Sequence, residues 1–413
     1  MSDLLLLTPQ LPYPPQQGTS LRNFHIIKGL SGRHQITLLS FLQDQYESDP
    51  LPRTPLSALC QEVVTVPAPQ PRTTPTRLRQ MLTTRMPDMS LRLESQRFEI
   101  TLWRLLSENR FDIVQIEGIE MAWTIKTIRQ VRPNQSIVFD AHNAEAVLQY
   151  RASQADMENP RRWPAAAYSL VQSRRLRQFE TWIGDQANWI TAVSQIDKEN
   201  LAEQMKKKPV PISVIPNCID VAQYDVESNP GQDQSGVKEF DIVFLGKMDY
   251  RPNVDAVLWF ADKVWPLLVA SMPEITWAVV GQKPHARLDR LHGVPGITVT
   301  GWVEKVQPYL AGARVFIMPF RVGSGTRLKL IEALAAGRAV VSTSLGVEGY
   351  PVQDGQELLL ADSADEMASK ILRLLQDSDF RAQLGKTGRE FSQQYDWRKV
   401  IPIFDQVYEA LAV

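Results

Sequence analysis

Short apolar runs alternate with longer amphipathic stretches along most of the chain. Runs typical of buried strands occupy residues 4–7, 35–41, 62–66, 111–116, 137–140 and 189–193. Helical patterns lie between them, among them residues 20–30 and one long stretch at about 144–185. Strands that alternate with helices predict parallel βαβ units and therefore an α/β fold.

A polar segment without apolar periodicity, residues 226–240, predicts a linker. A second series follows it, with strands expected at 241–245, 276–280, 297–300, 315–319 and 339–343. The sequence therefore predicts two doubly wound parallel-sheet domains, residues 1–225 and 241–395. Residues 396–413 are expected to form a C-terminal helix that packs back on the first domain. Such sheets bind ligands outside the carboxyl ends of their strands, and two facing domains predict an interdomain cleft.

Composition narrows the function classes. The 413 residues carry a net charge of -1, which argues against general nucleic-acid binding. The sequence contains no run of eighteen apolar residues, so no membrane span is expected. The N-terminus lacks the basic start of a signal peptide, so no signal peptide is expected. Cys60 and Cys218 are far apart, so we expect free thiols and a cytoplasmic location. The five histidines have no metal-ligand spacing, so no metal and no cofactor are expected.

Charge is uneven within the first half. Residues 72–110 contain eight arginines against four acidic residues, and more arginines lie between 161 and 177. One interpretation is the solvated face of amphipathic helices. The other is a surface that meets an anionic acceptor or, peripherally, an anionic membrane.

The loop after the strand at 315–319 carries the strongest chemical pattern. A glycine turn, Gly323 to Gly325, leads into a helix, and free backbone N–H groups with the positive end of a helix dipole form an anion site. Either Ser324 or Thr326 is expected to cap the helix. Arg327 and Lys329 add positive charge.

Glu332 lies one to two turns into the same helix. Helical side chains tilt toward the N-terminus, so Glu332 leans back toward the anion site. A carboxylate only accepts hydrogen bonds and suits two vicinal hydroxyls, such as those of a ribose. Phosphate at the helix start and ribose one turn on describe a nucleoside diphosphate. The alternative is that Lys329 and Glu332 form an i,i+3 surface pair beside ordinary turn glycines.

Other strand ends repeat the pattern. Gly246 and Lys247 follow one strand, and Gly281 and Gly301 end two more. Glu348 stands between glycines, where it either accepts from a ligand or caps the next turn.

The first half shows the same pattern. Gly18, Thr19 and Arg22 follow the first strand, and His142 and Asn143 follow the strand at 137–140. For His142 a structural role and a catalytic role are both open. A dinucleotide oxidoreductase is a poor alternative, because no G-x-G-x-x-G follows the first strand.

These residues match a known family. The segments "PPQQGTSLRN", "FDAHNAE", "VIPNCID", "FLGKMDYRPNVDAVLWF" and "PFRVGSGTRLKLIEALAAGRAVVSTSLGVEG" resemble the retaining family-4 glycosyltransferases. The resemblance spans nearly the whole chain and is strongest to sugar transferases of bacterial polysaccharide and cell-surface glycan biosynthesis. It implies a GT-B fold, that is, two facing Rossmann-like domains with a cleft between them.

The resemblance also implies an activity. A sugar would move from a nucleoside diphosphate sugar to an acceptor, with retention at the anomeric carbon and without a metal. The expected acceptor is a lipid-linked or polysaccharide glycan. The alternatives are a small soluble acceptor, a nucleotide-sugar epimerase, or a binder without turnover. Many members carry a second glutamate eight residues before the Glu332 position, where this chain has Ser324.

The residue roles follow from the same resemblance. The expected catalytic residues are His142, Lys247, Lys329 and Glu332. Lys247, Arg327 and Lys329 would stabilise the leaving diphosphate, Glu332 would bind the ribose, and His142 would contact the sugar hydroxyls or the developing charge. The expected donor-binding residues also include Gly18, Gly281, Gly301, Val303, Arg321, Gly323, Ser324, Gly325, Thr326 and Arg327. The expected acceptor-side residues are Thr19, Arg22 and Asn143.

Overall fold

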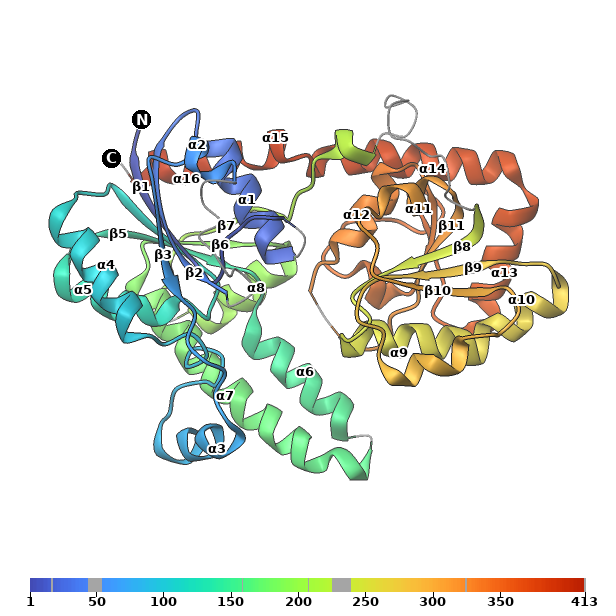
Figure 1. Cartoon of the computed structure of the whole chain (residues 1–413), viewed down its shortest axis with the longest axis horizontal. Helices are drawn as coiled ribbons and strands as arrows, with labels where there is room; N and C mark the ends of the chain where they lie inside the picture. The colour runs from blue at the N-terminus through green and yellow to red at the C-terminus, as the bar shows by residue number, and fades with distance from the viewer. Residues whose placement is uncertain are drawn as a thin grey trace. The chain divides into compact units, whose positions relative to one another are not determined.

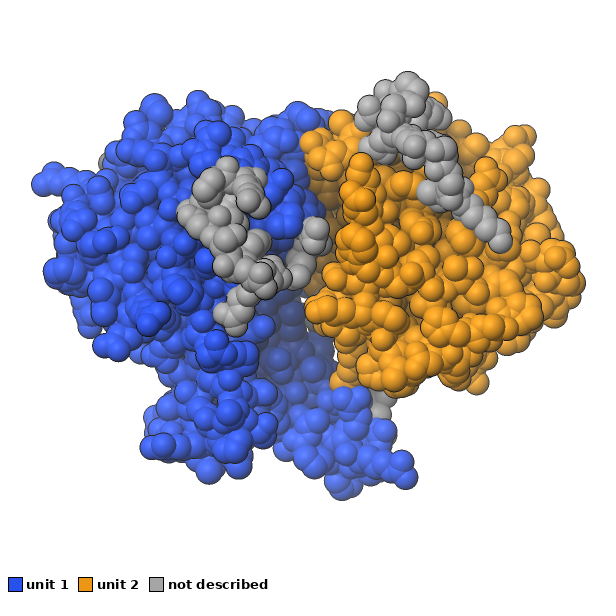
Figure 2. Space-filling model, in the orientation of Figure 1, with its two compact units in different colours: residues 1–218, 397–413 blue, residues 219–396 orange. Residues whose placement is uncertain are grey.

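The structure is a computed structural model that describes residues 1–15, 18–43, 54–157, 159–206, 208–224, 239–323 and 325–411. It contains two compact units, which Figure 2 shows in blue and orange. Unit 1 comprises residues 1–218 and 397–413, and unit 2 comprises residues 219–396. The units divide after Cys218, whereas the expected first domain extended to residue 225. Most of the expected linker lies outside the described residues.

Unit 1 is built on a seven-stranded parallel sheet with the order β3-β2-β1-β4-β5-β6-β7 (Figure 1). Its strands are β1 (Asp3–Thr8), β2 (Gln35–Leu42), β3 (Glu62–Pro67), β4 (Ile113–Glu117), β5 (Ser136–Ala141), β6 (Trp189–Ala192) and β7 (Ile212–Val214). Its helices are α1 (Gly18–Leu30), α2 (Leu56–Leu59), α3 (Thr74–Thr83), α4 (Gln96–Glu108), α5 (Ile125–Val131), α6 (Glu145–Met157), α7 (Trp163–Gln186), α8 (Gln195–Gln204), α15 (Trp397–Val400) and α16 (Pro402–Leu411).

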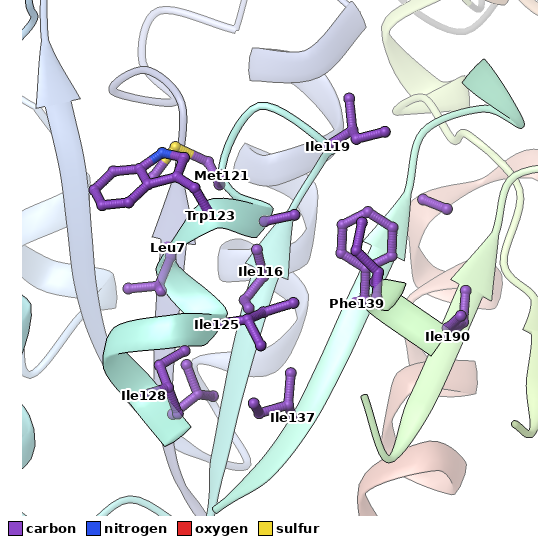
Figure 3. Packing of buried hydrophobic residues seen from close by; sticks show 14 of the residues in the cluster. Leu7, Ile116, Ile119, Met121, Trp123, Ile125, Ile128, Ile137, Phe139 and Ile190 are labelled. Atoms are coloured by element: carbon purple, nitrogen blue, oxygen red, sulfur yellow. The ribbon is translucent and has the colours of Figure 1, made fainter. Parts of the chain in front are cut away.

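β1 contains four consecutive leucines, and these are buried on both faces of the sheet. Leu5 and Leu7 belong to one core cluster and Leu4 and Leu6 to another, because successive side chains of a strand point to opposite faces. Both faces of the sheet are covered, so a continuous apolar run is the expected pattern. Figure 3 shows part of the first cluster, in which Leu7 lies among isoleucines of β4, β5 and α5.

The helical stretch at 144–185 is two helices rather than one. α6 ends at Met157 and α7 begins at Trp163, with a 3-10 turn at Pro160–Arg162 between them. Proline lacks the N–H that a helix interior needs, so Pro160 ends the helical run that the surrounding pattern predicts. The two helices then pack side by side (Figure 1).

The C-terminal segment packs on α1 within unit 1. Val400, Ile401 and Phe404 share a core cluster with Ile26 and Ile27 of α1. Gly29 makes this contact possible, because a Cβ there would lie 2.6 Å from a side-chain carbon of Ile401. No described helix is long and apolar enough to span a bilayer.

Unit 2 has a six-stranded parallel sheet with the order β10-β9-β8-β11-β12-β13. Its strands are β8 (Phe240–Leu245), β9 (Trp277–Val280), β10 (Ile297–Gly301), β11 (Ala313–Met318), β12 (Ala339–Ser342) and β13 (Leu359–Leu360). Its helices are α9 (Arg251–Trp259), α10 (Trp265–Ser271), α11 (Gln307–Ala311), α12 (Leu328–Ala335), α13 (Ala364–Gln376) and α14 (Ser378–Ser392). α9 and α10 are joined by the π-helical turn Phe260–Val264.

The strand orders give each unit a topological switch point. In both sheets the order reverses beside the first strand, between β1 and β4 in unit 1 and between β8 and β11 in unit 2. The carboxyl ends of the strands at such a switch point are where doubly wound sheets bind ligands. The candidate residues follow these strands or their neighbours.

Candidate functional site

Two glycines bring the strand ends of unit 2 close together. A Cβ at Gly281, after β9, would lie 1.6 Å from the carbonyl oxygen of Gly246, after β8. A Cβ at Gly246 would lie 2.9 Å from the Lys329 Nζ. Any larger residue would therefore separate the two loops or displace the lysine, so the glycines are required by close approach and not merely by turn geometry.

Lys329 lies at the centre of this edge. Its ammonium donates to the Leu245 carbonyl oxygen at 2.7 Å and to the Asn253 Oδ1 at 2.9 Å. It also lies 4.9 Å from the ring centroid of Phe244 and 5.0 Å from that of Phe320. Burial, reinforced by the nearby charge of Arg327 and opposed by that of Glu332, lowers the pKa of Lys329 to about 7. The lysine is thus a cation held by uncharged oxygens and aromatic faces.

Asn253 is a site residue that the sequence reasoning missed. Its side chain accepts from Lys329 and donates to the Lys247 carbonyl oxygen at 2.8 Å, so it ties the loop after β8 to α12. The signal available in the sequence was an amide side chain that directly follows a proline, a few residues after Gly246 and Lys247.

The turn before α12 differs from the expectation in one respect. α12 begins at Leu328 with Arg327 as its N-cap and without a side-chain capping bond, so Thr326 is not the cap. Gly323 and Gly325 adopt φ values of 102° and 82°, which favour glycine. Ser324 lies outside the described residues. The helix therefore starts later than its pattern predicts, because the two positive-φ glycines extend the loop.

Arg327 is the second cation of the edge. It donates to the carbonyl oxygens of Gly325 at 3.2 Å and Leu345 at 2.7 Å, and it stacks 4.5 Å from the Phe320 ring centroid. Burial lowers the pKa of Arg327, while the charge of Glu348 opposes that change. Glu348 therefore acts on the site electrostatically, although its expected contact with a ligand stays a prediction.

Glu332 has a partner that the sequence reasoning missed. The Tyr224 hydroxyl donates to Glu332 Oε1 at 2.8 Å, and Tyr224 is buried at the end of the 3-10 turn Val221–Tyr224. Burial raises the pKa of Glu332, and both this hydrogen bond and the Lys329 charge oppose the rise. Tyr224 lies 108 residues earlier in the chain, so sequence spacing carried no signal for the pair.

The remaining donor-side residues are less closely gathered. Lys247 is exposed and lies 3.7 Å from Asp249, and Arg321 turns toward Asp255 and Trp259 of α9. Gly301 has a φ of 71° with open space beside it. Val303 is half-buried two residues after β10.

A buried ion pair lies beside the switch point of unit 1. Arg22 of α1 is 2% exposed and binds Asp140 through two hydrogen bonds, Nε to Oδ2 at 2.6 Å and Nη2 to Oδ1 at 2.7 Å. Burial alone would raise the pKa of Asp140, but the guanidinium lowers it to about 2. Thr191 also donates to this carboxylate. Arg22, expected on the acceptor side, is thus directed into the protein in this structure and organises Asp140.

His142 follows Asp140 and contacts a second buried acid. Its Nε2 lies 3.4 Å from Glu117 Oε2 at the end of β4 and 3.8 Å from Asp140 Oδ2. Burial would lower the pKa of His142, but Glu117 and Asp140 raise it. Burial and the charge of Asp140 raise the pKa of Glu117 to about 7. The two buried acids therefore favour the protonated form of His142.

Other first-half candidates lie around this pair. Asn143 donates to Glu145 Oε1 at 3.0 Å at the start of α6. Gly18 and Thr19 begin α1, where Gly18 is exposed with open space beside it.

Glu117, Asp140 and His142 also have the spacing of a metal site. Their ligand atoms lie within 4.8 Å of one another. Both Asp140 oxygens, however, already accept from the Arg22 guanidinium. A metal ion bound there would face this fixed cation, so the charges favour an ion-pair network over a metal site.

Comparison with known proteins agrees with the fold and the motifs. Residues 239–377 match the family described as glycosyl transferases group 1, and residues 18–223 match glycosyltransferase family 4. A phosphatidyl-myo-inositol mannosyltransferase from Mycolicibacterium smegmatis is 31% identical over 205 residues, 48% of this chain and 52% of the relative. The chain therefore spans about half the length of this curated relative.

Solved structures resemble the chain over its full length. A sucrose-phosphate synthase from Thermosynechococcus elongatus has a TM-score of 0.74 at 17% identity and covers 99% of both chains. Anabaena HepE in complex with UDP-glucose has a TM-score of 0.66 at 14% identity, covering 99% of this chain and 100% of HepE. These likenesses show a shared fold. The chain belongs to the family-4 glycosyltransferases, with their GT-B architecture of two parallel-sheet α/β domains.

Proposed function

We propose that the protein is a retaining glycosyltransferase that moves a sugar from a nucleoside diphosphate sugar to an acceptor. The observation that carries the proposal is the position of Lys329. Its buried ammonium donates its hydrogen bonds to uncharged oxygens, and it lies at a switch point, where this topology binds ligands. A diphosphate is an anion that suits it.

The cations would act on the leaving group. As the bond between the sugar and the diphosphate breaks, negative charge grows on the diphosphate, and fixed positive groups in a water-poor site lower the energy of that transition state. Lys329 and Arg327 are already oriented by backbone carbonyls and by Phe320. Lys247 is exposed nearby and would add a third charge. In other enzymes a metal ion supplies this positive charge. Here these side chains would supply it, so transfer is proposed to proceed without a metal ion.

Glu332 is proposed to bind the ribose. Tyr224 occupies its Oε1 and orients the carboxylate, and the other oxygen would accept from the ribose hydroxyls. His142, with its raised pKa, is proposed to contact the transferred sugar as an imidazolium.

The relatives support the donor class. HepE has been solved with UDP and with UDP-glucose, and a trehalose-6-phosphate structure from Escherichia coli, 12% identical with a TM-score of 0.62, holds UDP-2-fluoro glucose. Which base and which sugar this chain uses is best tested directly. Thermal unfolding measured with UDP-, GDP- and ADP-sugars should show a rise in Tm for one base, because a ligand that binds the folded state raises its stability.

Product analysis tests the reaction itself. Incubation of the best donor with lipid-linked and soluble glycan acceptors should yield a glycoside whose anomeric NMR signals match those of the donor sugar. An inverted linkage would refute retention. An epimerised sugar nucleotide formed from donor alone would favour an epimerase, and tight binding without product would favour a non-catalytic binder.

The acceptor is proposed to be lipid-linked and reached at an anionic membrane surface. On α3, Leu78 and Leu82 are 59% and 79% exposed at i,i+4 spacing, so they form one apolar stripe. Arg79 and Arg85 are exposed beside it. An apolar stripe flanked by arginines is typical of a helix that lies on an anionic bilayer.

A co-sedimentation experiment distinguishes an enzyme that binds membranes through this surface from one that acts on a soluble acceptor. Vesicles with 30% phosphatidylserine should bind the protein at low salt, and Leu78→Ser with Leu82→Ser should weaken binding about tenfold or more by removing apolar burial. Leu267→Ser, an exposed leucine on α10 of unit 2, is the matched control. If the wild type, the double variant and Leu267→Ser bind the vesicles equally, or if none of them binds, α3 is not a membrane-binding surface.

A further inference from the structure

A line of buried polar contacts runs from the C-terminal helix to His142. The Tyr408 hydroxyl of α16 donates to Gln115 Oε1 on β4, and Gln115 Nε2 donates to Glu117 Oε1 at 2.6 Å. The other oxygen of Glu117 lies 3.4 Å from His142 Nε2. Tyr408, Gln115 and Glu117 are each at most 1% exposed, so water does not compete for these bonds.

The chemistry of the groups determines which one donates and which one accepts in each hydrogen bond. When Glu117 is ionised, its carboxylate only accepts hydrogen bonds, so Gln115 turns its NH2 toward Glu117 and its carbonyl toward Tyr408. Tyr408 must then donate. By the same rule His142 presents a protonated Nε2 to Glu117, which leaves Nδ1 as the nitrogen that determines whether the ring is neutral or cationic.

The surroundings of His142 favour the cation. Glu117 and Asp140 both approach Nε2, Arg22 neutralises part of the Asp140 charge, and Glu145 of α6 adds a further carboxyl nearby. Gly118 lies against the ring, where a Cβ would be 3.1 Å from Nδ1. The ring is therefore held both by its polar partners and by the backbone beneath it.

Helix α16 reaches both ends of this network. Phe404 lies 5.8 Å from the Arg22 guanidinium, and Tyr408, one turn later on the same face, begins the line to Glu117. The segment that returns to unit 1 at the end of the chain thus touches Arg22 directly and Glu117 through Gln115.

We propose that Tyr408, Gln115 and Glu117 are positioning residues that hold His142 as an imidazolium with its Nε2–H on the buried carboxylates. The C-terminal helix thereby sets the charge of a candidate catalytic residue. The inference deepens the proposed function, because its consequence for catalysis rests on His142 serving in transfer.

Histidine NMR on the whole protein tests the network without any substrate. The chain has five histidines, so ring-labelled spectra can be assigned by replacing each in turn. In the wild type, His142 should carry its proton on Nε2 when neutral and titrate above the usual histidine range. Glu117→Gln should lower the pKa of His142 by about 1 unit or more.

The decisive variant is Tyr408→Phe, which removes one hydroxyl and keeps the ring. Without that donor Gln115 no longer holds Glu117 as firmly, so the pKa of His142 should fall measurably, and the alkaline limb of the kcat profile should move down by the same amount. Val407→Ala, a buried neighbour on α16 that loses only packing, should leave the pKa of His142 unchanged. Gln115→Met breaks the same series of hydrogen bonds at its β4 residue, so it should lower the pKa of His142 as Tyr408→Phe does.

Each outcome is decisive. An unchanged His142 pKa in folded Tyr408→Phe and Gln115→Met, or an equal shift in Val407→Ala, would overturn the positioning role. A neutral His142 protonated on Nδ1 would overturn it as well. If the NMR result holds but no donor and acceptor yield product, the network stands and the proposed transfer fails.

Discussion

In unit 2, the loops at the switch point surround Lys329 and Arg327, whose ammonium and guanidinium donate to carbonyl and amide oxygens. In unit 1, the cation beside the equivalent switch point is Arg22, which instead binds the carboxylate of Asp140 at 2.6 Å. The two sheets share a strand order through their first four strands and place cations at the same edge. The partner makes the difference. A carboxylate neutralises the cation of unit 1, whereas the uncharged oxygens in unit 2 leave the charge of Lys329 able to attract an anion.

Burial disfavours the charge of both cations, but their net pKa shifts are opposite for that reason. Desolvation lowers the pKa of Lys329 to about 7 because only uncharged oxygens hold its ammonium directly. Desolvation also opposes the charge on Arg22, but Asp140 reverses the effect and raises the pKa of Arg22. A destabilised cation gains from an incoming anion, whereas a paired cation does not. Four predictions test this contrast.

The largest expected effect is on the stability of unit 1. Arg22→Met leaves Asp140 buried without its partner, and breaking a buried pair in this way typically costs about 3–5 kcal/mol of unfolding free energy. Urea unfolding followed by tryptophan fluorescence measures the loss. Arg33→Met is the matched control, because Arg33 is 46% exposed where it meets Asp405 and such pairs contribute about 0–1 kcal/mol. Equal losses in the two variants would show that Arg22 is not the structural cation.

Lys329→Met should affect function instead. Removing one group that stabilises the transition state lowers kcat by about 10²–10³-fold, while unfolding should be no easier than in the wild type because a desolvated charge is gone. Initial rates with the best donor and thermal unfolding measure the two effects. Lys370→Met is the control and should keep full activity, because Lys370 lies on α13 and pairs with Asp354. A stable, fully active Lys329→Met would contradict the proposed diphosphate site.

The lowered pKa of Lys329 predicts a dependence on pH. Between about pH 7 and the ordinary lysine value of 10.5, the unfolded chain binds one more proton at Lys329 than the folded chain, so this group makes the unfolding free energy rise with pH. Diphosphate binding requires the ammonium, so the affinity for UDP or GDP should fall by up to about tenfold per pH unit above 7. Isothermal titration at pH 7, 8 and 9 measures it. In Lys329→Met the binding that remains should lose this slope, and an unchanged slope would assign it to another group.

The smallest expected effect concerns the ribose. Glu332→Gln keeps the shape of the side chain but removes the charge of the acceptor, and a hydrogen bond to a charged group contributes about 1.5–3 kcal/mol. Nucleoside diphosphate affinity should fall by about tenfold or more, while the 2′,3′-dideoxy analogue should bind both proteins equally. Tyr224→Phe should give a milder form of the same loss, since it frees the carboxylate from its orienting donor. Equal losses for the ribo and dideoxy nucleotides would refute the ribose role.

Much of the fold was predictable because its strands are buried on both faces. A short apolar run such as that of β1 is typical of a strand that is buried on both faces, and the glycines that end β9 and β10 mark where each strand stops. The end of α12 was equally clear, since Gly337 adopts a φ of 67° after Ala335. Short or interrupted elements were harder. β13 has two residues, and the break between α6 and α7 lies within a pattern that remains helical on both sides of Pro160.

The candidate site was predictable only where one segment contains its chemistry. The sequence by itself determined that glycines, Arg327, Lys329 and Glu332 gather where a strand meets a helix, because they are consecutive along one βα unit. It did not determine what holds them. Tyr224 meets Glu332 across 108 residues, Arg22 meets Asp140 across 118, and Tyr408 meets Gln115 across 293. Only the tertiary structure decided these partners, because the hydrogen bonds and charges that set each group's ionisation come from strands and helices that the fold, not the chain order, makes neighbours.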